Sequence, residues 1–197
     1  MTPNTRFPGR TAAASHGPGS PRRAMRMATA GVATALVLGA LAAAGPAHAS
    51  ASATLTNRDG ETVGTVTLQE TANGVLLRAE FDGLPPGTHG FHIHETGLCT
   101  PDFSAAGGHF AGGGESHGFI VATGPHAGDL PNIHVPESGR LTVEMFNDRI
   151  TLDAGQGAIR EGDGSAIIVH AGADDYESQP SGDAGERIAC GVIVDVD

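Results

Sequence analysis

Short stretches of alternating apolar and polar residues, separated by glycine-rich turns, fill most of the chain beyond residue 50. Alternation with a period of two residues is typical of β-strands that bury one face. This region shows no sustained 3.6-residue apolar period, which an amphipathic helix would require. We expect eight strands, over residues 53–56, 63–69, 75–81, 89–94, 140–146, 149–152, 165–170 and 187–194.

Many short strands with turns between them predict an all-β fold, either a sandwich or a barrel. Two long stretches, residues 95–136 and 172–186, lack a strand pattern. Loops of that length in a compact domain are usually functional or disordered. The first of them contains four of the ten histidines, so we interpret it as a functional loop.

The first 49 residues have the layout of an export signal. A polar segment containing arginines precedes an alanine-rich apolar run, which ends at the small-residue pattern Ala47-His48-Ala49. We interpret residues 1–49 as a secretory signal peptide and residues 50–197 as the mature domain. An uncleaved membrane anchor is the alternative. The Arg22-Arg23 pair leaves open whether export uses the general or the twin-arginine route.

Export also bears on the two cysteines, Cys99 and Cys190. Two lone cysteines in an exported chain usually form a disulfide, and two free thiols are the alternative. The charge balance is acidic: 11 arginines and no lysine stand against 22 acidic residues, for a net charge of −11. Five of the arginines lie in the first fifty residues, where no acid occurs, so six face 22 acids afterwards, a balance of −16. Such a domain is poorly suited to nucleic acid or to an anionic membrane surface.

The sequence His92-Ile93-His94 lies in one of the expected strands. Side chains alternate between the faces of a strand, so Phe91 and Ile93 should enter the core while His92 and His94 share the outer face. Two imidazoles at positions i and i+2 can bind one metal ion. His170, at the end of the apolar strand 165–170, is a candidate third ligand.

The long loop adds His109, His117, His126 and Asp129. Three imidazoles and one carboxylate can complete a tetrahedral zinc site. Gly107-Gly108 and Gly112-Gly113-Gly114 would let the chain wrap closely around an ion. The alternative is a flexible loop of glycine and histidine that binds stray metal, but this does not account for Asp129 or His170.

Five separated motifs resemble those of the copper/zinc superoxide dismutases, in the same order along the chain. They are Gly-Phe-His-Ile-His-Glu at 90–95, Gly-Gly-His-Phe at 107–110, His-Ala-Gly-Asp-Leu at 126–130, Val-His at 169–170 with Ala-Asp-Asp at 173–175, and Gly-Glu-Arg-Ile-Ala-Cys-Gly-Val-Ile at 185–193. The resemblance extends from about residue 53 to the C-terminus. It implies an eight-stranded Greek-key barrel or sandwich with long metal-binding and channel loops.

The resemblance also implies two metal sites that share one residue. Copper would be bound by His92, His94, His109 and His170. Zinc would be bound by His109, His117, His126 and Asp129, so that His109 bridges both metals.

Further residues match positions with known roles in that family. Arg187 would attract and orient the anionic substrate beside copper. Asp174 would link one copper ligand to one zinc ligand, and Cys99 and Cys190 would form the disulfide that ties the metal loop to the barrel.

The implied reaction converts superoxide to dioxygen and hydrogen peroxide by Cu(II)/Cu(I) cycling, with zinc as a structural and tuning ion. An inactive dismutase-like metal-binding module and an exported copper buffer are the alternatives. The segment 174–187 is shorter than in the animal enzymes and lacks lysine, and Cys99 lies closer to His94. The sequence leaves open whether the protein is a homodimer, whether it is secreted or kept at the cell envelope, and how copper is loaded.

Overall fold

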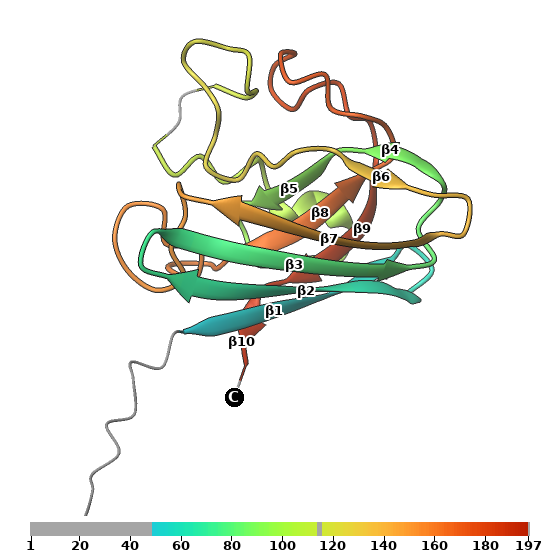
Figure 1. Cartoon of the computed structure of the whole chain (residues 1–197), viewed down its shortest axis with the longest axis horizontal. Coiled ribbons are helices and arrows are strands. Elements are labelled where there is room, and N and C mark those ends of the chain that lie inside the picture. The colour runs from blue at the N-terminus through green and yellow to red at the C-terminus, as the bar shows by residue number, and fades with distance from the viewer. Residues whose placement is uncertain (1–48, 114–115, 197) are drawn as a thin grey trace, which may run out of the picture. The chain divides into compact units, whose positions relative to one another are not determined.

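Ten β-strands and one 3₁₀ helix form the regular structure of the residues that this computed structural model describes, 49–113 and 116–196 (Figure 1). The expected signal peptide lies almost entirely outside the described residues. Within them, no helix is long and apolar enough to cross a membrane. The elements are β1 Ser50–Asn57, β2 Thr62–Thr71, β3 Gly74–Asp82, β4 Gly87–His89, β5 Phe91–His94, η1 Phe103–Ala106, β6 Ile133–Val135, β7 Arg140–Asn147, β8 Ala166–His170, β9 Arg187–Val192 and β10 Val194–Asp195.

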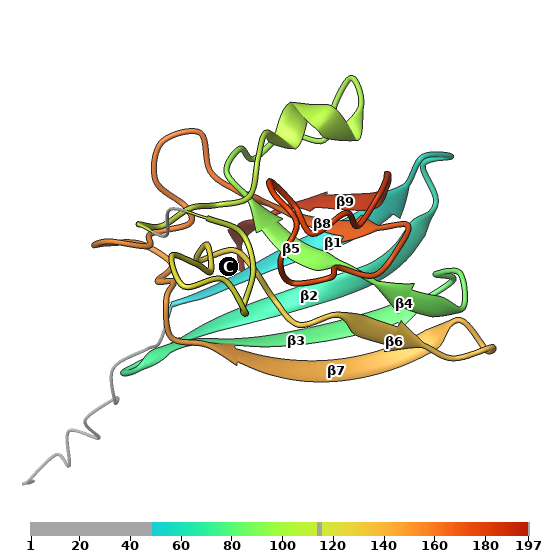
Figure 2. The same ribbon diagram turned by 90° about the horizontal axis from the view of Figure 1, so that it is seen from above.

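One antiparallel sheet contains eight of these strands. Seven follow the order β5-β8-β9-β1-β2-β3-β7, and β10 pairs with β1. Strands β4 and β6 form a separate two-stranded sheet. The pairs β3–β7 and β5–β8 join strands that are not consecutive in sequence. The chain therefore crosses from one end of the large sheet to the other, as in a Greek key. Figure 2 shows that the large sheet curls, with β5 and β7 at its two ends.

The core lies inside this curl and follows from the alternation in the sequence. In β3, Val75, Leu77, Ala79 and Phe81 are buried, whereas the residues between them are exposed. Phe81 packs against Phe91 of β5 with an edge-to-face geometry and 5.9 Å between the ring centroids. The buried faces of distant strands therefore form one apolar cluster.

Strand β8 is buried on both faces, which explains its continuous apolar sequence. Ile167 and Val169 belong to the main core. Ala166 and Ile168 face the other way and pack with Phe103 of η1 and with Cys190 in a second, smaller cluster. The long segment after β5 thus covers the outer side of the sheet at β8 and β9.

The all-β prediction is confirmed, with differences in detail. The expected strand 89–94 is two strands, because β4 pairs with β6 and β5 pairs with β8. Gly90, between them, hydrogen-bonds instead to residues 170 and 172. A Cβ at Gly90 would lie 2.9 Å from that of Ala184, so the chain can make this change of partner only with glycine there.

The expected strand 149–152 is wrong. Ile150 and Leu152 are buried as the pattern indicated, but the chain turns back after them, and only an isolated bridge between Thr151 and Ala158 forms. Strand β6 and the helix η1 were not expected, because both are too short for a periodic signal. The helix does carry a capping residue, since Asp102 accepts a hydrogen bond from the Ser104 amide.

The predicted disulfide between Cys99 and Cys190 is confirmed. The two Cα atoms are 5.9 Å apart, and 91 positions separate the residues in sequence. The bond ties the segment that leads into η1 to strand β9.

We expect loss of this disulfide to lower the free energy of unfolding of the metal-free protein by about 4–5 kcal/mol, because closing a loop of this length restricts the unfolded chain. Denaturant unfolding of native protein and of the Cys99→Ser/Cys190→Ser double variant measures the difference. Adding reductant should reproduce the loss in the native protein and change nothing in the double variant. Coincident unfolding curves would contradict the expectation.

Candidate metal centre

The outer face of β5 carries two of the candidate metal ligands. His92 and His94 do lie on the face opposite Phe91 and Ile93, as the alternation predicted. The two imidazoles are nevertheless fully buried, with 0% of each residue exposed. The long loop covers this face, so the histidines are not exposed to solvent as an outer face would be.

The loop reaches this position by pairing with the free edge of β5. The Phe110 amide donates to the Ile93 carbonyl and the Ile93 amide donates to the Gly128 carbonyl, both at 2.9 Å. These contacts create isolated antiparallel bridges that pair His92 with Asp129 and His94 with His109. Two loop residues that lie 20 positions apart are thereby placed beside the strand histidines.

Glycine allows this close pairing. A Cβ at Gly128 would lie 2.3 Å from the Ile93 carbonyl oxygen, which no side chain permits. Gly107 has a φ of 74°, in the left-handed region that favours glycine, and its carbonyl faces the His94 ring. The predicted role of glycine in wrapping the loop is thus seen at Gly107, whereas Gly128 was not among the glycines predicted to have it.

The first cluster brings together four imidazoles whose ligand atoms lie within 4.8 Å of one another. Protein oxygens hold the rings from outside: the Gly107 carbonyl at 3.0 Å from His94 Nδ1 and the Gly185 carbonyl at 3.1 Å from His170 Nδ1. A ring nitrogen that donates to a carbonyl leaves the other nitrogen as a lone pair, free for a metal. The members are His92, His94, His109 and His170.

The second cluster centres on Asp129. Its Oδ1 atom lies 2.8 Å from His109 Nδ1, 3.1 Å from His117 Nδ1 and 3.6 Å from His126 Nδ1. Its Oδ2 atom accepts hydrogen bonds from the amides of Gly118 and His126, at 2.9 and 3.0 Å. Two backbone amides thus fix Oδ2, while Oδ1 lies close to three imidazole nitrogens.

His109 belongs to both clusters. Its Nδ1 faces Asp129, and its Nε2 belongs with the other three imidazoles. The rings of His92 and His109 are in contact, with centroids 4.1 Å apart. One imidazole therefore presents a nitrogen to each side.

Buried nitrogens without hydrogen-bond partners show that these clusters suit metal ions. Buried polar atoms are normally hydrogen-bonded, because an unpaired one is costly. Within the described residues, six imidazole nitrogens are buried and have no such partner. They are His92 Nδ1, His94 Nε2, His109 Nε2, His117 Nδ1, His126 Nδ1 and His170 Nε2.

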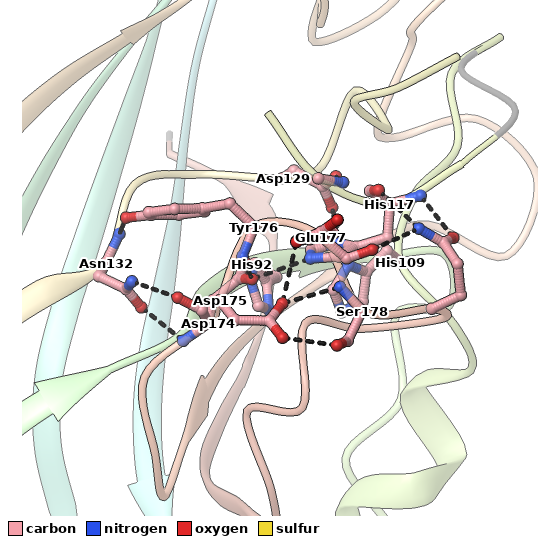
Figure 3. Close-up of polar contacts among 12 residues, drawn as sticks. His92, His109, His117, Asp129, Asn132, Asp174, Asp175, Tyr176, Glu177 and Ser178 are labelled. Atoms are coloured by element: carbon pink, nitrogen blue, oxygen red, sulfur yellow. Dashed lines mark hydrogen bonds and ion pairs between the residues drawn. The ribbon is translucent and has the colours of Figure 1, made fainter. Parts of the chain in front are cut away.

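Asp174 contacts one imidazole of each cluster, as Figure 3 shows. Its Oδ2 lies 2.9 Å from His92 Nε2, and its Oδ1 lies 2.9 Å from His117 Nε2. A carboxylate that accepts the outer N–H of an imidazole fixes the orientation of the ring. Asp174 does this for one residue of each cluster.

Burial lowers the pKa of three histidines in the first cluster. It lowers the pKa of His92 to about 4 and that of His170 to about 3, and it holds the pKa of His94 well below the usual value. Burial also lowers the pKa of His117, but Asp129 and Asp174 outweigh it and raise that pKa to about 9. Burial by itself would raise the pKa of Asp129, but its close contacts with the imidazoles of His109 and His117 bring that pKa far below the usual range.

Comparison with known proteins identifies the family. The sequence profile described as copper/zinc superoxide dismutase (SODC) matches residues 62–193. The superoxide dismutase (Cu-Zn) 2 of Aquifex aeolicus is 47% identical over 147 residues, covering 73% of this chain and 85% of that protein. The superoxide dismutase (Cu-Zn) of Caulobacter vibrioides is 44% identical over 148 residues, covering 73% and 85%.

The chain belongs to the copper/zinc superoxide dismutase family. A crystal structure of a double mutant of a SOD-like protein from Bacillus subtilis matches it with a TM-score of 0.69 and 42% identity, over 72% of this chain and 95% of that one. The protein is thus a superoxide dismutase whose cofactors are copper and zinc, and its two clusters can hold metal ions.

Arg187 of this dismutase lies at the start of β9, beside the first cluster. Its two terminal nitrogens donate to the carbonyls of Phe103 and Gly107, at 2.7 and 2.6 Å. Gly107 thereby accepts hydrogen bonds from both Arg187 and His94. Partial burial lowers the pKa of Arg187, and the positive charge of its guanidinium lowers that of His94.

Some groups that orient the residues of the site could not be identified from the sequence. The carbonyls of Gly107 and Gly185 orient His94 and His170, but backbone atoms are present at every position and mark nothing in a sequence. Asn132, next to β6, hydrogen-bonds the backbone of Asp174 on both sides. His134 lies in neither cluster; it is exposed and its Nδ1 is 3.0 Å from Thr88 Oγ1.

We expect the metal-free dismutase to be most stable near neutral pH. Because the pKa values of His92 and His170 are lower in the folded protein, the unfolded chain takes up protons first, so stability falls as pH drops from about 6.5 towards 4. His117 acts in the opposite sense: its raised pKa contributes stability that is complete below about 6.5 and is lost as pH rises through about 9.

Thermal unfolding of chelator-treated protein across this pH range measures the effect. The metal-loaded protein is the control, because an ion held by the second cluster would take the place of a proton at His117 Nδ1. A melting temperature that is constant between pH 5 and 7 would contradict the assignment of neutral, buried imidazoles.

Proposed function

We propose that His92, His94, His109 and His170 bind copper, that His109, His117, His126 and Asp129 bind zinc, and that the protein converts superoxide to dioxygen and hydrogen peroxide at the copper side. The observation that carries this proposal is the position of His109, which presents one ring nitrogen to each cluster. A single imidazole between two ion sites has a use in a two-metal enzyme and none in a simple metal buffer.

The donor sets support the assignment of the metals. Imidazole suits both copper and zinc, and a carboxylate suits harder ions. Three imidazoles and one carboxylate close a four-coordinate zinc site. The other cluster has nitrogen donors only, and when bound there copper supplies the one-electron oxidation and reduction that this reaction requires.

His109 also has a place in the proton balance. Formation of hydrogen peroxide from superoxide consumes two protons. Nε2 of His109 is the atom that can hold one of them beside the substrate, while Nδ1 stays directed at the Asp129 side. Asp174 contacts both His92 and His117, and so holds a copper ligand and a zinc ligand in a fixed relative orientation.

Arg187 is suited to attract the anion. Beyond residue 50 the chain has six arginines against 22 acids, so the overall field repels superoxide. A local positive charge next to the copper cluster can reverse this field over a short range. The carbonyls of Phe103 and Gly107 fix the guanidinium and leave its other N–H groups for the substrate.

Export is part of the same proposal. Residues 1–49 would act as a signal peptide and residues 50–197 would be the mature domain, secreted or kept at the cell envelope. The Cys99–Cys190 disulfide supports this, because such bonds persist in oxidising compartments outside the cytosol. Mass determination of the protein recovered from the culture medium and the cell envelope would test the cleavage position.

We expect His92→Ala to abolish superoxide consumption while zinc stays bound. The substitution removes one copper ligand and leaves all four zinc ligands in place. Activity assay and elemental analysis of metal-loaded protein measure both outcomes. His134→Ala, which changes an exposed histidine outside both clusters, is the matched control and should keep full activity. Equal rates for the native protein and His92→Ala would refute the copper assignment.

We expect Arg187→Glu to slow the reaction at least about tenfold at low salt, because electrostatic steering changes association rates by that order or more. The dependence of the rate on ionic strength should also change, since salt screens the attraction that Arg187 provides. Arg140→Glu alters the net charge equally at an exposed position on β7, paired with Asp82, and is the control. If both variants had the same rate and salt profile, Arg187 would have no special part in steering.

A further inference from the structure

Tyr176 has a backbone conformation that only a specific environment would maintain. It lies two residues after Asp174, in the segment between β8 and β9, with a φ of 64°. This left-handed conformation is unfavourable for a bulky residue, and such outliers concentrate at functional sites. The surrounding contacts indicate what the conformation achieves.

Four contacts connect Tyr176 to three separate parts of the chain, and Figure 3 shows Tyr176 beside two of these parts, Asp174 and Asn132. Its amide donates to Asp174 Oδ1 at 2.6 Å, and its hydroxyl accepts the Asn132 amide at 2.8 Å. Its carbonyl accepts the Ile120 amide at 3.4 Å, and its ring packs against Phe119, with centroids 5.4 Å apart. Asp174, β6 and the loop after His117 therefore meet at this residue.

The approach to the loop is unusually close. A Cβ at Gly118 would lie 2.1 Å from the Tyr176 carbonyl oxygen, so only glycine fits there. Gly118 follows His117 directly, and its amide donates to Asp129 Oδ2. Tyr176 is thus packed against the segment that presents two of the four members of the second cluster.

Asn132 holds Asp174 from the other side. Its Nδ2 donates to the Asp174 carbonyl and its Oδ1 accepts the Asp174 amide, both at 2.8 Å. The same residue supplies the amide that Tyr176 Oη accepts. Asn132 and Tyr176 together fix the carboxylate that contacts His92 and His117.

We propose that Tyr176 is a positioning residue that couples the order of the zinc-holding loop to the orientation of Asp174, and through Asp174 to His92 in the copper cluster. This inference rests on the proposed assignment of the two metals. Loss of the Tyr176 side chain should therefore weaken zinc binding and also change the environment of copper, although Tyr176 contacts neither cluster with its own side chain.

Two variants separate the contributions of the side chain. Tyr176→Phe removes the hydroxyl and keeps the ring against Phe119, whereas Tyr176→Ala removes both and retains an unfavourable left-handed φ. Substitution of residues that support the metal ligands through hydrogen bonds typically lowers metal affinity 10–100-fold. We therefore expect the zinc dissociation constant to rise about tenfold or more for Tyr176→Ala and less for Tyr176→Phe. Glu177→Gln, an exposed neighbour, is the control and should leave the constant unchanged.

Two measurements on the purified protein test this. Competition with a chromophoric chelator gives the zinc affinity of each variant, and electron paramagnetic resonance of Cu(II) added to zinc-loaded protein reports the copper environment. We expect both to change in Tyr176→Ala, and the copper spectrum of Glu177→Gln to match that of native protein. A lower melting temperature in both Tyr176 variants with native zinc affinity and a native copper spectrum would overturn the inference.

The native protein supplies a further readout. Its sequence has one tyrosine and no tryptophan, so emission excited at wavelengths beyond the phenylalanine absorption band comes from Tyr176 alone. Zinc added to metal-free protein should raise the fluorescence anisotropy of Tyr176, because the ordered loop packs against its ring; constant anisotropy at saturating zinc would also overturn the inference. Native protein that bound no zinc at all would instead refute the proposed metal assignment.

Discussion

Four buried imidazoles in this protein share one arrangement: one ring nitrogen faces a protein oxygen, and the other is left without a hydrogen-bond partner. The oxygens come from Asp174, which serves two rings, and from the carbonyls of Gly107 and Gly185. Because burial disfavours the charged imidazole, these contacts decide which nitrogen keeps a lone pair. The rings of His92, His94 and His170 are thus neutral and oriented without a metal.

The oxygens themselves depend on distant parts of the fold. The disulfide between Cys99 and Cys190 ties the segment before Gly107 to β9, and Phe103 of η1 packs on the outer face of β8. This brings the Gly107 carbonyl to both His94 and Arg187. One cross-link therefore supports an imidazole of the first cluster and the positive charge of Arg187 beside it.

The two long segments for which the sequence showed no strand pattern act together. The first pairs with the free edge of β5 and supplies His109 and Asp129, and the second supplies Asp174 and Tyr176. They meet at Phe119, Ile120 and Tyr176 rather than through a shared sheet. Loops that carry function need such anchors, because they lack the regular hydrogen bonds of a strand.

The sequence by itself determined the fold class and the candidate ligands. Alternation in β3 and the apolar run of β8 follow directly from which faces are buried, and histidine with carboxylate in a glycine-rich loop already indicates metal. The resemblance to a known family then named Arg187 and Asp174. The expected strand at 149–152 shows the limit of the alternation pattern. Ile150 and Leu152 are buried, but only an isolated bridge forms there.

Only the tertiary structure decided how the ligands meet. His92 and His94 are buried rather than exposed because residues 107–113 and 116–130 fold over β5, a contact between segments that no local period encodes. Two of the four outer ring nitrogens face backbone carbonyls, which are chemically identical along the chain and become distinct only by position. The contacts of Asn132 with Asp174 and Tyr176, and of Tyr176 with Phe119, arise in the same way, because each joins residues that lie 42 or more positions apart.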